Sequence, residues 1–131
     1  MFGIDTNVLI RCLVADPSSG QPSELAAEML ETASEDILVN PVVLAELAWV
    51  LESRFNFKRR QVGEVLDIML AAPALKIERR SEVEHAIGEF QTSRADFADC
   101  LIAALNHAAG CHTTLTFDKA AAKGPYFTLL S

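Results

Sequence analysis

The stretch MFGIDTNVLI (residues 1–10) places the acidic residue Asp5 between two apolar runs. The first run predicts a β-strand over residues 1–4, and residues 6–14 predict a helix that Asp5 or Thr6 is well suited to cap. In open α/β sheets, ligands bind just outside the carboxyl ends of the strands. Asp5 therefore has two interpretations at this point, a helix cap or a functional acid.

Strand-like and helix-like segments alternate along the rest of the chain. Short apolar runs predict strands at residues 37–39, 75–77, 113–117 and 126–130. Helical periodicity predicts helices at residues 23–33, 42–55, 59–70 and 98–109, and one more that the capping-box pair Ser81 and Glu84 opens. Alternation of this kind is typical of βαβ units, with a parallel sheet between helices. The 131 residues fit a single domain, residues 1–131, with one core.

The composition is that of a globular protein, with 50% hydrophobic and 22% charged residues. Its apolar runs are far shorter than the roughly 20 residues of a membrane span. Its start lacks the basic and long apolar regions of a signal peptide. The three cysteines are an odd number without a disulfide pattern, which agrees with a reducing compartment. We therefore expect a soluble, cytoplasmic protein without membrane association.

The net charge of −7 argues against a protein that coats nucleic acid, because such binding depends on Lys and Arg. It does not exclude an enzyme that meets phosphate through metal ions. Basic residues gather at residues 54–60 and 76–80, and solvated helix ends are favoured over a nucleic-acid track as their interpretation. A zinc site at His107, Cys111 and His112 is disfavoured, because structural zinc needs four ligands.

Glu46 occupies an unusual position for an acidic residue. It lies within the helical segment VVLAELAWVL (42–51), where its neighbours three and four residues away are apolar. Burial of an unpaired charge there would cost several kcal/mol, so Glu46 needs a cation or a protonated state. The interpretations are a buried salt bridge or a functional acid, and the second is favoured because perturbed carboxylates cluster at functional sites.

Three aspartates in the C-terminal half of the chain stand at the ends of predicted helices or strands. Asp99 precedes residues 100–117, which contain no Asp, Glu, Lys or Arg, so it is expected to cap a deeply packed helix. Alternatively, Asp96 and Asp99 could act as the cap and its first-turn partner. Asp118 ends the strand TTLTF (113–117) in the way that Asp5 ends MFGI, although a surface pair with Lys119 is also possible.

These positions predict one acidic cluster. If the strands before Asp5 and Asp118 are neighbours, those two carboxylates meet Glu46 and Asp99 at one sheet edge. Clusters with only oxygen ligands suit Mg²⁺ or Mn²⁺. One or two such ions and an activated water molecule would hydrolyse phosphodiester bonds.

Four segments together make the chain resemble the PIN-domain ribonucleases, specifically the VapC-type toxins of toxin–antitoxin pairs. They are IDTNVLI, NPVVLAELAWVL, DFADCLIAAL and TLTFDKAA, in the order and spacing of that family. The resemblance implies a three-layer α/β/α fold whose five-stranded parallel sheet has the order 3-2-1-4-5. It also implies that the site lies at the carboxyl edge of the first and fourth strands.

The resemblance assigns roles to individual residues. Asp5, Glu46, Asp99 and Asp118 match the acidic quartet of the family, as catalytic residues and metal ligands. Asp96 matches a further acid that many members carry. Thr6, Asn7 and Thr116 match positions that support the quartet, with Asn7 and Thr6 orienting Asp5.

The implied activity is that of a Mg²⁺- or Mn²⁺-dependent endoribonuclease that arrests translation. The implied partners are RNA, a VapB-like antitoxin that occludes the site, and a second copy of the chain in a homodimer, with larger toxin–antitoxin assemblies also open. One alternative is another Mg²⁺-dependent phosphohydrolase with an aspartate nucleophile, which Asn7 disfavours because such enzymes usually carry a second Asp there. Another is a PIN-fold module that binds or regulates without catalysis.

Overall fold

The computed structural model describes residues 1–14 and 35–131, and the helix expected at residues 23–33 lies outside this range. The elements, in chain order, are β1 (Phe2–Gly3), α1 (Thr6–Leu13), β2 (Ile37–Val39), α3 (Pro41–Arg54), α4 (Arg59–Ala71), β3 (Leu75–Ile77), α5 (Arg80–Thr92), α6 (Phe97–Ala108), β4 (Thr114–Thr116), the 3-10 helix η1 (Ala121–Lys123) and β5 (Phe127–Leu129). The expected α/β alternation is confirmed over the described residues.

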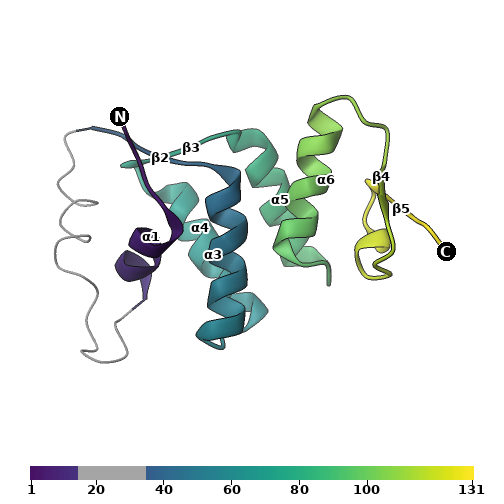
Figure 1. Ribbon diagram of the computed structural model, residues 1–131, viewed down its shortest axis with the longest axis horizontal. Helices are drawn as coiled ribbons and strands as arrows, with labels where there is room; N and C mark the ends of the chain where they lie inside the picture. The colour runs from purple at the N-terminus through teal and green to yellow at the C-terminus, as the bar shows by residue number, and fades with distance from the viewer. Residues whose placement is uncertain (15–34) are drawn as a thin grey trace.

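The strands form two parallel sheets instead of one. The first has the order β1-β2-β3, with Phe2 opposite Ile37 and Ile37 opposite Leu75. The second is the pair β4-β5, with Thr114 opposite Phe127. In Figure 1 these two sheets lie at opposite ends of the molecule, with α3 and α6 between them. The neighbours expected within each group are confirmed, but β1 and β4 do not pair within the described residues.

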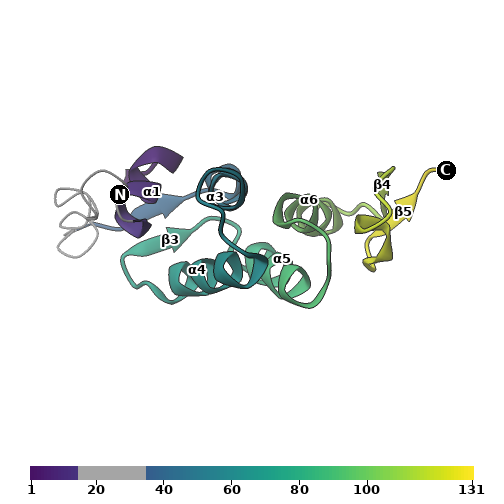
Figure 2. The same ribbon diagram turned by 90° about the horizontal axis from the view of Figure 1, so that it is seen from below.

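Helices cover both faces of the three-stranded sheet. Figure 2 shows α1 and α3 on one side of it and α4 on the other, which gives three layers in this part of the molecule. Apolar side chains without any exposed surface, such as Leu9, Ile37 and Leu47, fill the space between the layers. Further along, Phe90 of α5 packs edge-to-face on Phe97 of α6, with 5.9 Å between ring centroids. Removal of this apolar surface from water is the main term that holds the layers together.

Polar residues at the element junctions begin the helices at the expected places. The Asn40 side chain accepts a hydrogen bond from the Val43 amide at 3.0 Å, and Pro41 follows in the first turn of α3. Such caps satisfy amides that have no partner inside the helix, and proline fits the first helical position. Asn40 and Pro41 therefore mark the start of α3, the helix that carries Glu46, in the sequence.

The expected capping box of α5 is wrong. The helix begins at Arg80, and its N-cap residue is Arg79 in the left-handed region with φ 57°. Ser81 therefore lies within the first turn. Glu84 accepts a hydrogen bond from Arg80 at 2.8 Å, so its carboxylate is engaged with a neighbouring cation and not with the start of the helix.

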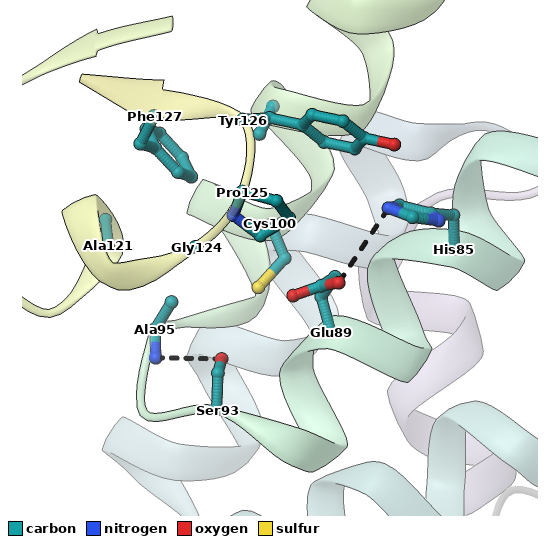
Figure 3. A pocket seen from close by; sticks show the side chains of 11 residues that line it. His85, Glu89, Ser93, Ala95, Cys100, Ala121, Gly124, Pro125, Tyr126 and Phe127 are labelled. Carbon is teal, nitrogen blue, oxygen red and sulfur yellow. Dashed lines mark hydrogen bonds and ion pairs between the residues drawn. The ribbon is translucent and has the colours of Figure 1, made fainter. Parts of the chain in front are cut away.

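The segment that contains β4, η1 and β5 packs on α5 and α6. The Tyr126 ring stacks on His107 with 4.1 Å between centroids, and the Asn106 side chain donates a hydrogen bond to the Thr114 hydroxyl at 3.1 Å. Tyr126 also packs on α5, where its ring centroid lies 5.2 Å from that of His85, and Figure 3 shows these two side chains next to each other. The second sheet is therefore attached to the helices rather than to the first sheet.

Two observations bear on the expected environment of the protein. Within the described residues, no helix has both the length and the apolar character needed to cross a membrane. The three cysteines, Cys12, Cys100 and Cys111, are free.

His107 stacks on Tyr126 and Cys111 is exposed, and no group of metal-binding residues forms around them in the described chain.

Candidate metal centre

A groove of about 530 Å³ lies between the start of α1 and the exposed side of α3. Asp5, Thr6 and Asn7 line it from α1, and Glu46 lines it from α3. The two elements meet here because both follow parallel neighbouring strands, β1 and β2, so their N-terminal ends lie at the same sheet edge. The groove therefore contains two of the four expected carboxylates.

Asp5 caps α1, as its position predicts. Its Oδ1 atom accepts a hydrogen bond from the Val8 amide at 3.0 Å. The side chain is exposed, and within the described part of the chain its second oxygen accepts no hydrogen bond. Capping and ligand binding are therefore compatible, because the cap engages one carboxylate oxygen of a residue that lines the groove.

Glu46 is exposed, and the expectation that it lies on a buried face is wrong. The buried face of α3 consists of other residues, including Val43, Leu44 and Leu47. The apolar neighbour Trp49 shares the solvent-facing stripe with Glu46 and is 62% exposed. The Thr6 hydroxyl donates a hydrogen bond to Glu46 Oε1 at 3.2 Å. Thr6 therefore positions the Glu46 carboxylate, whereas the family resemblance had implied that Thr6 orients Asp5.

The other acidic residues form a second cluster at the start of α6. Asp96 is the N-cap, and its Oδ1 atom accepts a hydrogen bond from the Asp99 amide at 2.7 Å. Asp99 therefore lies in the first helical turn. The expectation that Asp99 is the cap is wrong, and the alternative, with Asp96 as the cap and Asp99 as its first-turn partner, is confirmed. The pKa of Asp99 is raised from 3.8 to about 6, most of all by burial and then by the negative charges of Asp96 and Asp118.

Asp118 is held by the turn that follows β4. Its Oδ1 atom accepts hydrogen bonds from the amides of Ala120 and Ala121, at 2.8 and 3.0 Å. Its own amide donates to the Thr116 hydroxyl at 3.0 Å. Thr116 thus fixes the backbone at Asp118, which agrees with the supporting role expected for it.

The four expected carboxylates lie in two groups of the described structure. Asp5 and Glu46 share the groove, and Asp118 is close enough to Asp99 for its charge to raise the pKa of Asp99. No three acidic, histidine or cysteine residues of the described chain are close enough together to hold a metal ion. The separation has one structural cause: Asp5 follows β1, Asp118 follows β4, and these strands do not pair within residues 1–14 and 35–131.

The raised pKa of Asp99 predicts a pH-dependent stability. The folded state binds the Asp99 proton more tightly than the unfolded state does. The free energy of unfolding therefore falls as pH rises from about 4 to about 6, and above this range it stays at the lower value. After allowance for solvent screening, we expect Asp99→Asn to raise the free energy of unfolding at neutral pH by about 1 kcal/mol at most.

Thermal unfolding in EDTA measures this difference, with the exposed Asp36→Asn as the matched control. Asp99→Asn is expected to melt above the parent protein at neutral pH and together with it below about pH 4. Equal melting temperatures at neutral pH would show that Asp99 carries no charge penalty.

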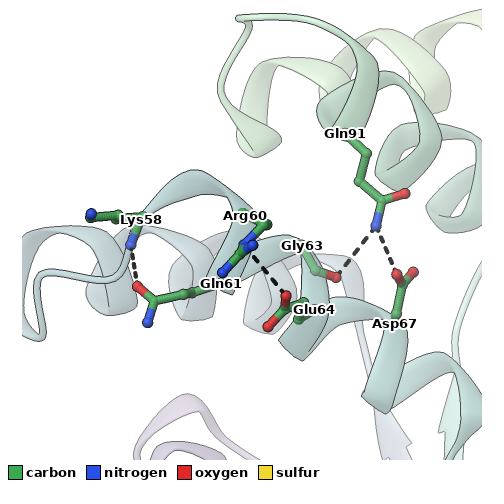
Figure 4. Close-up of polar contacts among 7 residues, drawn as sticks. All are labelled: Lys58, Arg60, Gln61, Gly63, Glu64, Asp67 and Gln91. Carbon is green, nitrogen blue, oxygen red and sulfur yellow. Dashed lines mark hydrogen bonds and ion pairs between the residues drawn. The ribbon is translucent and has the colours of Figure 1, made fainter.

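Most basic residues at 54–60 and 76–80 are exposed, as expected for solvated helix ends, but Arg59 is partly buried and contacts distant parts of the chain. Arg59 donates hydrogen bonds to the carbonyls of Phe90 and Ala95 and lies 4.0 Å from the Phe90 ring centroid. Figure 4 shows Arg60 paired with Glu64 beside the capping contact of the Lys58 amide. In the second run, Arg79 pairs with Glu82 and Arg80 with Glu84.

Two groove residues have no role in the sequence-based account. Trp49 and Arg54 line the groove together with the carboxylates, and both are exposed. Trp49 follows Glu46 by three residues, so helical spacing could have placed it beside that carboxylate. The apolar composition of the segment instead indicated a buried face, which concealed this signal.

Comparison with known proteins identifies the family. The model of the PIN domain family matches residues 3–124. The chain is also 26% identical over 98 residues to a protein of Aquifex aeolicus (strain VF5) named VapC ribonuclease, an alignment that covers 75% of this chain and 73% of that protein. The matched range includes both half-sites, which are the groove with Asp5 and Glu46 and the cluster with Asp99 and Asp118. The chain belongs to the PIN domain family.

Proposed function

We propose that this protein is a divalent-metal-dependent endoribonuclease and the toxin of a toxin–antitoxin pair. The observation that carries the proposal is that three of the four expected acids stand at element ends within a PIN domain, Asp5 as a cap, Asp99 in a first turn and Asp118 after a strand. The fourth, Glu46, lines one groove together with Asp5. The similarity to a protein named VapC ribonuclease supports RNA as the substrate. We further propose that residues 1–131 act as one domain.

The donor set fits a hard divalent cation, Mg²⁺ or Mn²⁺. Carboxylate oxygens are the ligands these ions prefer, and the described residues at both half-sites offer them. The raised pKa of Asp99 supports this fit. It comes in part from the negative charges of Asp96 and Asp118, and a bound cation would offset their repulsion. Asp5, Glu46, Asp99 and Asp118 would hold the metal, with Asp96 as a further candidate. The cation would neutralise the acids, bind the RNA phosphate and activate water for its hydrolysis.

The complete site requires that β1 and β4 become neighbours, in the sheet order 3-2-1-4-5. Both strands have an unpaired edge in the described structure, and apolar side chains on them are exposed: Phe2 by 53% and Leu115 by 61%. Exposed strand edges of this kind are templates for pairing. Pairing would bring the end of β1, with Asp5, towards Asp118 after β4.

The surrounding residues of the chain then have specific tasks. Thr6 holds Glu46 through its hydroxyl, and Thr116 fixes the backbone of Asp118. Asn7 lines the groove next to Asp5 and is proposed to orient it or the phosphate. Asp96 fixes the first turn of α6 and thereby the position of Asp99.

Glu46→Gln is expected to lower the affinity for Mn²⁺ by about tenfold or more, because the amide removes one anionic ligand while it preserves shape. Glu52→Gln on the same helix is the matched control, since Glu52 is exposed and lies outside the groove. Isothermal titration of Mn²⁺ into each variant measures the effect. An affinity equal to that of the parent would remove Glu46 from the metal site.

The proposed partners are RNA, a VapB-like antitoxin and a second copy of the chain. An antitoxin segment with a basic side chain could occupy the acidic groove and pair with its carboxylates. Induced expression of the protein with and without the adjacent antitoxin gene tests the toxin role. We expect growth arrest that the neighbour relieves. Unimpaired growth of cells that accumulate the folded protein would contradict it.

The alternatives predict different results. A phosphohydrolase with Asp5 as nucleophile would form a covalent phosphoaspartate, which the presence of Asn7 two residues later disfavours. A regulatory PIN-fold module would bind its partner equally well after Asp5→Asn. If the protein is a ribonuclease, we expect no covalent phosphoaspartate at Asp5 and no RNA cleavage by Asp5→Asn.

A further inference from the structure

We propose that Trp49 is a stacking platform for an unpaired base of the RNA substrate and that Arg54 holds a neighbouring phosphate. This inference rests on the proposed function and names the part of the site that recognises the nucleotide. Trp49 is the one tryptophan of the chain, and 62% of its side chain surface is exposed. Such a large apolar ring in water lacks the burial that would normally stabilise it.

The position of Trp49 connects it to the carboxylates. It stands one helical turn after Glu46 on the exposed stripe of α3, and both residues line the same groove as Asp5. An aromatic ring beside a metal-binding carboxylate allows one nucleotide to be held through its base while its phosphate lies at the acids. Stacking on an aromatic side chain is a common way to bind unpaired bases, and it tolerates every base because each has a π-face.

Arg54 supplies the cation that the groove otherwise lacks. It lines the groove from the last turn of α3 and makes no ion pair within the described residues. By contrast, Arg59, Arg60 and Arg80 are engaged by carbonyls or carboxylates. A guanidinium group in this position suits a phosphate group, to which it can donate two parallel hydrogen bonds.

RNA explains these residues better than a protein partner does. A protein surface packed on Trp49 would also cover Asp5 and Glu46, which lose solvation in such an interface unless cations pair with them. Of the proposed protein partners, only the antitoxin brings such a cation. An RNA strand instead brings its own counter-ions to the acids, a base to the ring and a phosphate to Arg54. The groove thus contains a partner for each chemical part of a nucleotide.

The fluorescence of Trp49 reports directly on this contact, because the chain has no other tryptophan. We expect a short single-stranded oligoadenylate or oligouridylate to quench it in the Asp99→Asn variant, which is proposed to bind without cutting. Trp49→Ala is expected to raise the dissociation constant for the same labelled RNA by about tenfold, and Trp49→Phe to restore most of the affinity. Val42→Ala is the matched control, since Val42 is 67% exposed on the same helix but does not line the groove.

The outcomes separate this inference from the proposed function. Unchanged fluorescence at saturating RNA, or equal RNA affinity of Trp49→Ala and the parent, would overturn the inference while cleavage by the parent still supports the function. If Trp49→Ala weakens the homodimer or the antitoxin complex and leaves RNA binding unchanged, the ring is a protein contact and the inference is wrong. If the parent protein cuts no RNA, the proposed function is contradicted, and so is the inference that rests on it.

Discussion

Asp99→Asn is expected to lower the rate of Mg²⁺-dependent RNA cleavage by about 1,000-fold or more, which corresponds to roughly 4 kcal/mol of transition-state stabilisation. The amide preserves the shape of the side chain and can still lie in the first turn of α6. It removes one anionic ligand from a group in which burial, followed by the charges of Asp96 and Asp118, raises the pKa of Asp99 to about 6. Loss of that ligand weakens the hold on the cation that activates water.

Cleavage of a labelled RNA by equal amounts of the two folded proteins measures this effect. Asp36→Asn serves as the control, because Asp36 is exposed and lies before β2, away from both half-sites. The higher thermal stability expected for Asp99→Asn at neutral pH excludes unfolding as the cause of the loss. A variant that cuts RNA at the rate of the parent would contradict the assignment of the quartet.

The amide hydrogens of Gly3 and Leu115 are expected to exchange about 100-fold more slowly once β1 and β4 pair. Phe2 and Ile4 donate hydrogen bonds to carbonyls on the β2 side, so the amide of Gly3 points to the open edge. Thr114 donates to Tyr126 on the β5 side, so the amide of Leu115 points to the open edge of β4. Formation of the sheet order 3-2-1-4-5 would bury and bond these two amides.

Hydrogen exchange followed by NMR, with and without Mg²⁺, measures this protection residue by residue. The amides of Phe2 and Thr114 are internal controls, because they already have partners and should change little. Protection that is independent of protein concentration would place the pairing within one chain, and protection that rises with concentration would place it between two copies. Rapid exchange at both Gly3 and Leu115 in saturating Mg²⁺ would contradict the proposed sheet.

Local signals in the sequence predicted the elements well. The strands at 37–39 and 75–77 have the expected bounds, and the acid that follows β1 caps the next helix. These features depend on neighbours within a few residues, such as the cap at Asp5 or the proline after Asn40. The helix expected at 98–109 begins one residue earlier than expected, at Phe97, because Asp96 and not Asp99 provides the cap.

Features that depend on distant partners were harder to predict. The buried position expected for Glu46 assumed that every apolar residue of α3 faces the core, but Val42 and Trp49 lie on its exposed side. The pairing of β1 with β4 joins residues more than 100 positions apart, and no local pattern specifies which open edges meet. The resemblance to a family supplied the order 3-2-1-4-5, which remains a proposal.

The central claim is that the chain is a metal-dependent endoribonuclease, and mapping of RNA ends after incubation with the purified protein tests it most directly. Pools of transfer, ribosomal and messenger RNA are incubated with parent protein in Mg²⁺ or in EDTA, and with Asp99→Asn in Mg²⁺. We predict new 5′ ends at discrete internal positions for the parent in Mg²⁺ alone. Absence of cleavage in all three pools, or identical cleavage in EDTA or by Asp99→Asn, would contradict the account.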